Sequence, residues 1–235
     1  MGDLLVNLLA SVIAGCSVWL AQRGLRRRTL ARRRTFFGVV PGEHCLLVVG
    51  KHASSPSEHS VSSRDVAALV ELATVVRSCG GHADLAIAGS PVAALGRQTE
   101  FCVGGPITNP RTAVHLRTML PGVRFEHDTF GGPEMAWWVG DAPFRWEPER
   151  VTYVVMAKVF APGSTRAVFI VAGQVAAANL AAARFLATRF ESLASRYGVS
   201  RQFCLVLRVA EPAAYGSDFV EVAADVTDAA LSAPA

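Results

Sequence analysis

Residues 45–50, Cys-Leu-Leu-Val-Val-Gly, form an unbroken apolar run that stops at a glycine. A run of this length that is apolar on both faces is typical of a strand buried inside a parallel sheet. A serine-rich polar stretch follows from Lys51 to Ser62. Apolar residues then recur with helical period until Gly80 and Gly81. The order strand, loop, helix predicts the first unit of an α/β domain.

The same order recurs further along the chain. Residues 83–88 and 101–103 predict two more strands, and Ser90 begins a short helix that ends near Leu95. Asn109-Pro110 opens another helix, with asparagine as its N-cap and proline at its first position. Short repeated units of this kind predict right-handed crossovers between parallel strands.

Residues 123–159 have a different pattern, in which alternating and aromatic segments are interrupted by Gly131-Gly132-Pro133, Gly140-Asp141 and Glu147-Pro148. This pattern is typical of antiparallel hairpins, which we expect to extend one edge of the sheet. Strands at 168–172, 203–209 and 219–226 and a helix at 176–197 complete the domain. We therefore predict an α/β, Rossmann-like three-layer domain with a mostly parallel sheet extended by antiparallel hairpins, preceded by one N-terminal transmembrane helix.

The N-terminal segment is apolar and is followed by a cationic cluster. Residues 4–22 contain no charged side chain, and a helix of that length spans about 28 Å, close to the hydrocarbon thickness of a bilayer. Seven arginines follow directly: Arg23, Arg26, Arg27, Arg28, Arg32, Arg33 and Arg34. By the positive-inside rule, this order predicts a single-pass protein of the cell membrane, with its N-terminus outside and its C-terminal domain in the cytoplasm.

This segment sets the expected domain organisation. Residues 1–22 are predicted to be a transmembrane anchor, 23–40 an Arg-rich juxtamembrane linker on anionic lipids, 41–228 the cytoplasmic α/β domain and 229–235 a disordered tail. Lipoprotein processing at Cys16 and a helix buried in a soluble fold stay open as alternatives. The arginines alternatively serve only as a topology signal. Small residues spaced four apart near Ala10 and Ala14 leave a homodimer open.

Charge and cysteine usage exclude two classes of function. Removing the seven arginines and Asp3 leaves 16 basic and 18 acidic residues, so the body of the chain is slightly acidic. A nucleic-acid binder carries its basic residues on the folded surface, so DNA and RNA are not expected partners. The five cysteines are far apart and none is paired with a histidine at zinc-ligand spacing, so the sequence predicts no metal site.

Two segments resemble each other and mark the candidate ligand site. In residues 101–109 and again in 169–179, a buried strand reaches a glycine and a short connection then leads into a helix. Ligands bind an open α/β sheet at this edge, where helix N-termini offer free N–H groups. The predicted ligand-binding residues are Gly50, Lys51, His52, Gly104, Gly105, Thr108, Asn109, Arg111, Thr112, Gly173, Gln174 and Asn179.

Neither segment matches the dinucleotide fingerprint or the phosphate-binding P-loop. The alternative interpretation is that the glycines only make tight turns and that Asn109 is an ordinary helix cap. Arg111 favours a ligand, because a cation in the first turn of a helix opposes the dipole.

No catalytic constellation is recognisable, so the catalytic residues stay unknown. The chain has no nucleophile elbow and no His-Glu-x-x-His motif. Cys102 lies inside an apolar strand, where an inert thiol is expected, and Glu100 and Glu134 are candidate bases only if folding brings them to the sheet edge.

Three functions remain. We expect a membrane-anchored domain that binds a nucleotide-like or other anionic small ligand as a sensor or effector component, with a nucleotide as the candidate cofactor. The alternatives are an enzyme that processes a nucleoside or nucleotide at the same edge, and a membrane-tethered scaffold that docks another protein through Trp137, Trp138 and Trp146.

Overall fold

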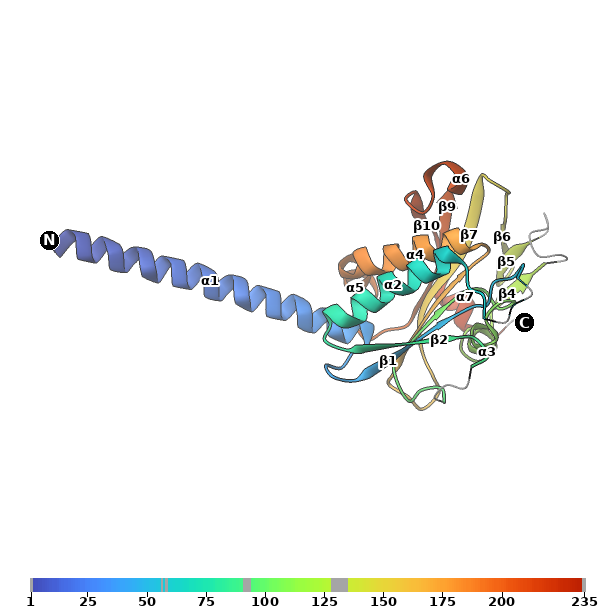
Figure 1. Cartoon of the computed structure of the whole chain (residues 1–235), viewed down its shortest axis with the longest axis horizontal. Helices are drawn as coiled ribbons and strands as arrows, with labels where there is room; N and C mark the ends of the chain where they lie inside the picture. Colours follow the sequence, from blue (N-terminus) through green and yellow to red (C-terminus); the bar gives the residue numbers. More distant parts are fainter. Residues whose placement is uncertain (1, 56, 58, 91–93, 128–134, 234–235) are drawn as a thin grey trace.

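The N-terminal helix α1 (Gly2–Phe37) is one continuous element that extends from the domain as a long arm (Figure 1). The computed structural model describes residues 2–55, 57, 59–90, 94–127 and 135–233, and only the backbone of residues 2–18 and 213. The helix ends at Gly38, whose φ of +64° is accessible to glycine at little cost. Phe36 and Phe37, in its last turn, are fully buried. The arm is therefore rooted in the hydrophobic core.

The prediction of a transmembrane anchor at residues 1–22 is corrected by this structure. None of the helices in the described part of the chain combines the length and apolar character that a membrane crossing needs. The arginine cluster belongs to the same unbroken helix as the residues before it. The predicted single-pass topology, with the N-terminus outside and a cytoplasmic C-terminal domain, is contradicted by this finding.

The main sheet has seven strands in the order β10-β9-β7-β8-β3-β1-β2. The four strands at one end run parallel: β2 (His82–Ile87), β1 (His44–Val49), β3 (Glu100–Val103) and β8 (Ala167–Gly173). From β8 onward the pairings are antiparallel, through β7 (Val151–Phe160), β9 (Phe203–Ala210) and β10 (Val220–Asp225). The sheet is therefore mixed.

The prediction of a mostly parallel sheet is wrong, because the connection between β7 and β8 is short. Only residues 161–166 connect β7 to β8, which is too short for a crossover and forces an antiparallel pair. Over the two sheets in the described part of the chain, five pairings are antiparallel and three are parallel.

The predicted hairpins do not extend the edge of the main sheet. They form a separate three-stranded antiparallel sheet from β4 (Val123–Glu126), β5 (Ala136–Val139) and β6 (Ala142–Arg145). Trp137 of β5 is fully buried against the face of the main sheet, together with Leu120 and Val155. The hairpins therefore cover a face, and β7, expected to belong to them, lies inside the main sheet.

Two layers cover the main sheet (Figure 1). On one face lie the last turn of α1, α2 (Ser63–Ser78), α4 (Ala176–Thr188) and α5 (Phe190–Tyr197). On the other face lie α3 (Pro110–Met119), α7 (Thr227–Leu231) and the small sheet. Because side chains alternate along a strand, Phe101 and Val103 of β3 face the first layer and Glu100 and Cys102 face the second.

Three terminal or connecting segments complete the description. The short helix α6 (Pro212–Tyr215) lies between β9 and β10. Helix α7 includes residues 229–231, which the sequence had assigned to a disordered tail. The predicted helix from Ser90 to Leu95 and the Gly131-Gly132-Pro133 interruption fall largely outside the described residues.

Candidate functional site

The turns that leave β1, β3 and β8 open on the same edge of the main sheet. These strands are parallel and adjacent, so their carboxyl ends at Val49, Val103 and Gly173 lie side by side. A crevice of about 180 Å³ lies at this edge. The predicted site residues that line it are Lys51, His52, Gly105, Thr108, Gly173, Gln174 and Asn179.

Glycine is required where two of these turns pack against each other. A Cβ on Gly50 would lie 2.6 Å from Thr108 Oγ1, and Gly104 has a φ of +107°. Thr108 also accepts a hydrogen bond at its backbone oxygen from Lys51 N–H, at 2.9 Å. Gly50 and Gly104 therefore allow Thr108 to lock the β1 turn onto the β3 turn, which is a role in packing.

Two of the predicted polar ligands use their side chains inside the protein. Asn109 caps α3 by accepting from the N–H groups of Arg111 and Thr112, and its Nδ2 donates to Val103 O at 3.0 Å. Gln174 accepts from Tyr153 N–H at 2.8 Å and donates to Phe144 O at 2.9 Å. Asn109 is therefore a helix cap, as the alternative interpretation stated. Gln174 connects the end of β8 to β7 and to the small sheet.

The crevice contains a buried carboxylate that the sequence did not identify as functional. Asp65, in the first turn of α2, lines the crevice although only 7 % of its surface is exposed. Its Oδ1 accepts a hydrogen bond of 2.8 Å from Asn179 Nδ2, and Asn179 Oδ1 accepts from Gly173 N–H at 2.7 Å. Burial raises the pKa of Asp65, and the hydrogen bond from Asn179 and the nearby His52 oppose that shift.

Asp65 was missed because its position also suits a helix-capping residue. Ser62 and Asp65 have the spacing of a capping box, yet the Ser62 side chain makes no cap hydrogen bond. Ser62 lines the crevice as well. The sequence feature that could have identified Asp65 is an acidic residue at the start of the helix after a strand-end loop. Acidic residues are common at such positions, so this feature alone does not indicate a ligand site.

The rest of the crevice is made by His52 and by the N-terminus of α4. His52 is exposed, and its Nδ1 accepts from Ser54 N–H at 3.2 Å. Helix α4 begins at Ala176 without a side-chain cap, and Val175 and Ala176 both line the crevice. The positive end of this helix dipole therefore faces the same space as Asp65. Lys51 Nζ lies beside Gly89, at the end of β2.

Arg111 and Thr112 do not join the crevice. Arg111 Nη2 donates to Glu100 Oε2 at 2.6 Å, and Arg111 lines a second cavity of about 270 Å³ together with His115. Thr112 is fully buried on the face of α3 that packs against the sheet. The sequence predicted that Arg111 would bind an anionic ligand at the start of this helix. The anion that it binds in the structure is the carboxylate of Glu100.

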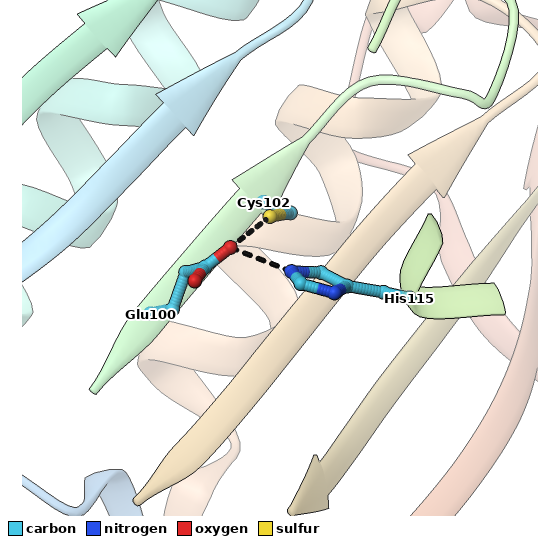
Figure 2. Close-up of side chains that lie close together, drawn as sticks. All are labelled: Glu100, Cys102 and His115. Atoms are coloured by element: carbon cyan, nitrogen blue, oxygen red, sulfur yellow. Dashed lines mark hydrogen bonds and ion pairs between the residues drawn. The ribbon is translucent and has the colours of Figure 1, made fainter. Parts of the chain in front are cut away.

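Glu100 is the centre of a buried polar cluster (Figure 2). His115 Nε2 lies 2.6 Å from Glu100 Oε1, and the Cys102 thiol donates to the same oxygen at 2.9 Å. Although burial raises the pKa of Glu100, the hydrogen bonds from His115 and Arg111 outweigh it and hold the pKa at about 2. Burial and the Glu100 charge raise the pKa of Cys102 well above its usual value, which excludes it as a free thiolate nucleophile.

No family model, curated protein or solved structure matches this chain. The residues of the crevice and of the Glu100 cluster therefore carry the functional inference.

Two of the three tryptophans expected to dock a partner, Trp137 and Trp138, belong to β5 of the small sheet. Trp137 is fully buried. Trp138 is partly buried, with the guanidinium groups of Arg124 and Arg145 within 6 Å of its ring. Trp137 has no surface to offer a partner, so the structure gives no support to a docking face built on it.

Proposed function

We propose that this protein binds a nucleotide-like small ligand in the crevice at the carboxyl ends of β1, β3 and β8. The observation that carries the proposal is Asp65, a buried carboxylate that lines the crevice opposite the N-terminus of α4. The crevice is thus lined by a hydrogen-bond acceptor, the Asp65 carboxylate, and by the N–H donors at the start of α4. A sugar phosphate combines hydroxyl donors with an anion and fits both.

The N-terminal turn of α4 supplies the anion site. Its first N–H groups have no carbonyl partner within the helix, and Val175 provides no side-chain cap. A phosphate placed there accepts these hydrogen bonds and interacts favourably with the helix dipole. Gly105 and Gly173 border the same space and let a ligand approach the backbone closely.

Asp65 supplies the hydroxyl site. Asn179 fixes the orientation of the carboxylate, and the hydroxyl groups of a ribose are suitable donors to its oxygens. The volume of about 180 Å³ is smaller than the 300 Å³ or more that is typical of drug-sized ligands. The crevice therefore suits the sugar phosphate part of a nucleotide, and we place the base outside it, toward the exposed His52.

The free-energy cost of burying the Asp65 carboxylate also supports a ligand-binding role for the crevice. Burial of a carboxylate destabilises the folded state, and a single side-chain hydrogen bond from Asn179 offsets only part of that cost. Costs of this kind are commonly found at functional sites, where they are retained for binding.

Isothermal titration calorimetry with AMP and ribose 5-phosphate tests the proposal. Asp65→Asn keeps the size of the side chain and removes its charge, and Asp141→Asn, an exposed aspartate in the β5–β6 turn, is the matched control. Loss of a hydrogen bond to a charged group costs about 1.5–3 kcal/mol, so the affinity of Asp65→Asn should fall about tenfold to 100-fold. Failure of wild type to bind either compound, or equal affinities of the two variants, refutes the proposal.

A catalytic version of the same site is the second candidate. A buried carboxyl group with a raised pKa in a crevice, next to a histidine, is the kind of group that serves as a general acid or base. If the protein cleaves a nucleotide, AMP should yield free adenine or adenosine in the presence of wild type, and Asp65→Asn should abolish turnover. AMP that binds and stays intact assigns the crevice to binding alone.

A further inference from the structure

Four polar side chains are buried between β3 and α3. Glu100 and Cys102 alternate on β3 and face α3, while Thr112 and His115 lie three residues apart on the helix and face the sheet. None of the four is more than 1 % exposed. Such a group at the centre of an apolar interface is costly and calls for a compensating interaction.

The donor atoms of three of these residues converge. One oxygen of Glu100, the sulfur of Cys102 and a ring nitrogen of His115 all lie within 4.8 Å of one another (Figure 2). In the described part of the chain this is the one such group of histidine, cysteine and acidic ligands. It is independent of the crevice, since its side chains lie on the opposite face of β3 from α2.

One further atom of the cluster, His115 Nδ1, lacks a partner among the described residues. Buried polar atoms are nearly always hydrogen-bonded, and exceptions point to a bound water, an ion or a chemical role. The hydrogen bonds to Glu100 therefore satisfy only part of the cluster.

We propose that Glu100, Cys102 and His115 bind one transition-metal ion of the zinc class. A thiolate, an imidazole and a carboxylate are the ligand types that zinc takes in proteins, and the thiolate selects against magnesium and calcium. Three protein ligands leave one position of a tetrahedral site open. The site could not be predicted from the sequence, because Glu100 and Cys102 lie on β3 whereas His115 lies on α3, 15 residues after Glu100.

Binding changes protons and charges in a defined way. Three bonds form, from the metal to Glu100 oxygen, Cys102 sulfur and His115 Nε2. The thiol proton leaves to solvent, and the imidazole proton moves from Nε2 to Nδ1. Glu100 and Arg111 are neutral as a pair before binding, and a divalent metal with the new thiolate adds a net charge of +1. A small anion taken from solution, such as chloride, at the fourth position makes the site neutral without releasing a second proton.

The surroundings support the site and include a cavity. Arg111 donates to both oxygens of Glu100, which fixes the carboxylate as second-sphere partners of metal ligands do. A cavity of about 270 Å³ is lined by Arg111 and by one of the three ligands, His115.

Cobalt(II) titration of the metal-stripped full-length protein tests the site. We expect one equivalent of cobalt to bind, with a thiolate-to-cobalt charge-transfer band and the intense visible bands of a tetrahedral site. Zinc should displace it. Calorimetry in two buffers of different ionisation enthalpy should report one proton released per metal ion.

Three variants separate this site from other metal binding. Cys102→Ser keeps a hydroxyl donor to Glu100 and should lose the thiolate band and at least tenfold in affinity. Cys204→Ser, at another buried free thiol, should change neither. His44→Ala with His82→Ala removes the imidazole pair at the sheet edge, whose rings lie 5.1 Å apart, and should also leave the band unchanged.

The wild-type spectrum decides the question even if Cys102→Ser fails to fold. A wild type that shows no thiolate band with cobalt overturns the proposal and leaves a closed hydrogen-bond cluster. A band that survives Cys102→Ser, or that disappears in the His44 and His82 double variant, overturns it equally.

Discussion

Asn179 links Asp65 to Gly173 across the crevice, donating to the carboxylate at 2.8 Å and accepting from the glycine N–H at 2.7 Å. This single buried amide holds the start of α2, the end of β8 and the first turn of α4 in one arrangement. A Cβ on Gly173 would lie 2.8 Å from Asn179 Oδ1, so the contact also depends on glycine. The shape of the proposed ligand site is therefore set by a residue that the proposed ligand does not need to touch.

Replacement of Asn179 by alanine should destabilise the protein by about 3 kcal/mol. The variant leaves the Gly173 N–H and the Asp65 carboxylate without their buried partner, and each unsatisfied group costs about 1–3 kcal/mol. Urea unfolding measures the loss. Gln202→Ala, at an exposed amide, is the control and should change the free energy of unfolding by less than about 0.5 kcal/mol. Equal stabilities of the two variants would show that the Asn179 bridge contributes nothing.

Replacement of Asp65 by asparagine should stabilise the protein at neutral pH. Because burial raises the pKa of Asp65 in the folded state, the native protein holds a proton that the unfolded chain has already lost. Stability from this group is therefore lost as pH rises from the unfolded pKa through the folded one. The variant lacks this loss and keeps an oxygen that accepts from Asn179.

The measurement is urea unfolding of wild type and Asp65→Asn between pH 3 and pH 7. The stability difference in favour of the variant should grow with pH over this range. A difference that is constant, or that shrinks, would contradict the assigned burial effect.

Lys158 should produce a rise in stability in alkaline solution. Its side chain is 1 % exposed, its Nζ donates to Val199 O at 2.6 Å, and burial lowers its pKa to about 8. Between pH 8 and the unfolded value of 10.5 the unfolded chain binds more protons, so stability increases with pH. The full effect is about 3 kcal/mol, from about 1.36 kcal/mol per pKa unit.

Lys158→Met checks this interpretation. Methionine fills a similar volume among Phe36, Phe160 and Phe169 and carries no charge. Its unfolding free energy should exceed that of wild type at pH 7, and the two should approach each other by pH 10.5. If wild type is the more stable at pH 7, the attraction of the ammonium for the surrounding rings outweighs its burial.

Phe36→Ala should cost about 3–5 kcal/mol, as expected for a buried aromatic side chain. The ring of Phe36 packs against Phe37, Phe169, Phe190 and Phe203. Leu25→Ala, on the same helix at a position 63 % exposed, is the control and should leave the melting temperature unchanged. A similar small effect of both changes would mean that the end of α1 is not part of the core.

The sequence located the edge where the strand-end turns meet, because that position depends only on local strand and helix order. Gly50, Gly105 and Gly173 each follow an apolar run, and parallel neighbours bring such turns together. The position of β7 inside the main sheet depended on its short connection to β8 and on its pairing with the distant strand β9. Local periodicity contains neither.

The side-chain chemistry at this edge was less predictable. Asn109 and Gln174 had suitable donors for a ligand, but backbone groups nearby take them first. Asp65 and the Glu100 cluster depend on contacts between elements far apart in the chain, including one of 114 residues between Asp65 and Asn179. Nothing in the spacing of these residues indicates that they meet.

The continuity of α1 has a mechanical consequence. A helix of 36 residues is about 54 Å long. Its C-terminal end is continuous with the domain, because the rings of its last turn pack against other phenyl rings of the core. A force applied near Gly2 would therefore act on the hydrophobic core into which Phe36 and Phe37 are packed.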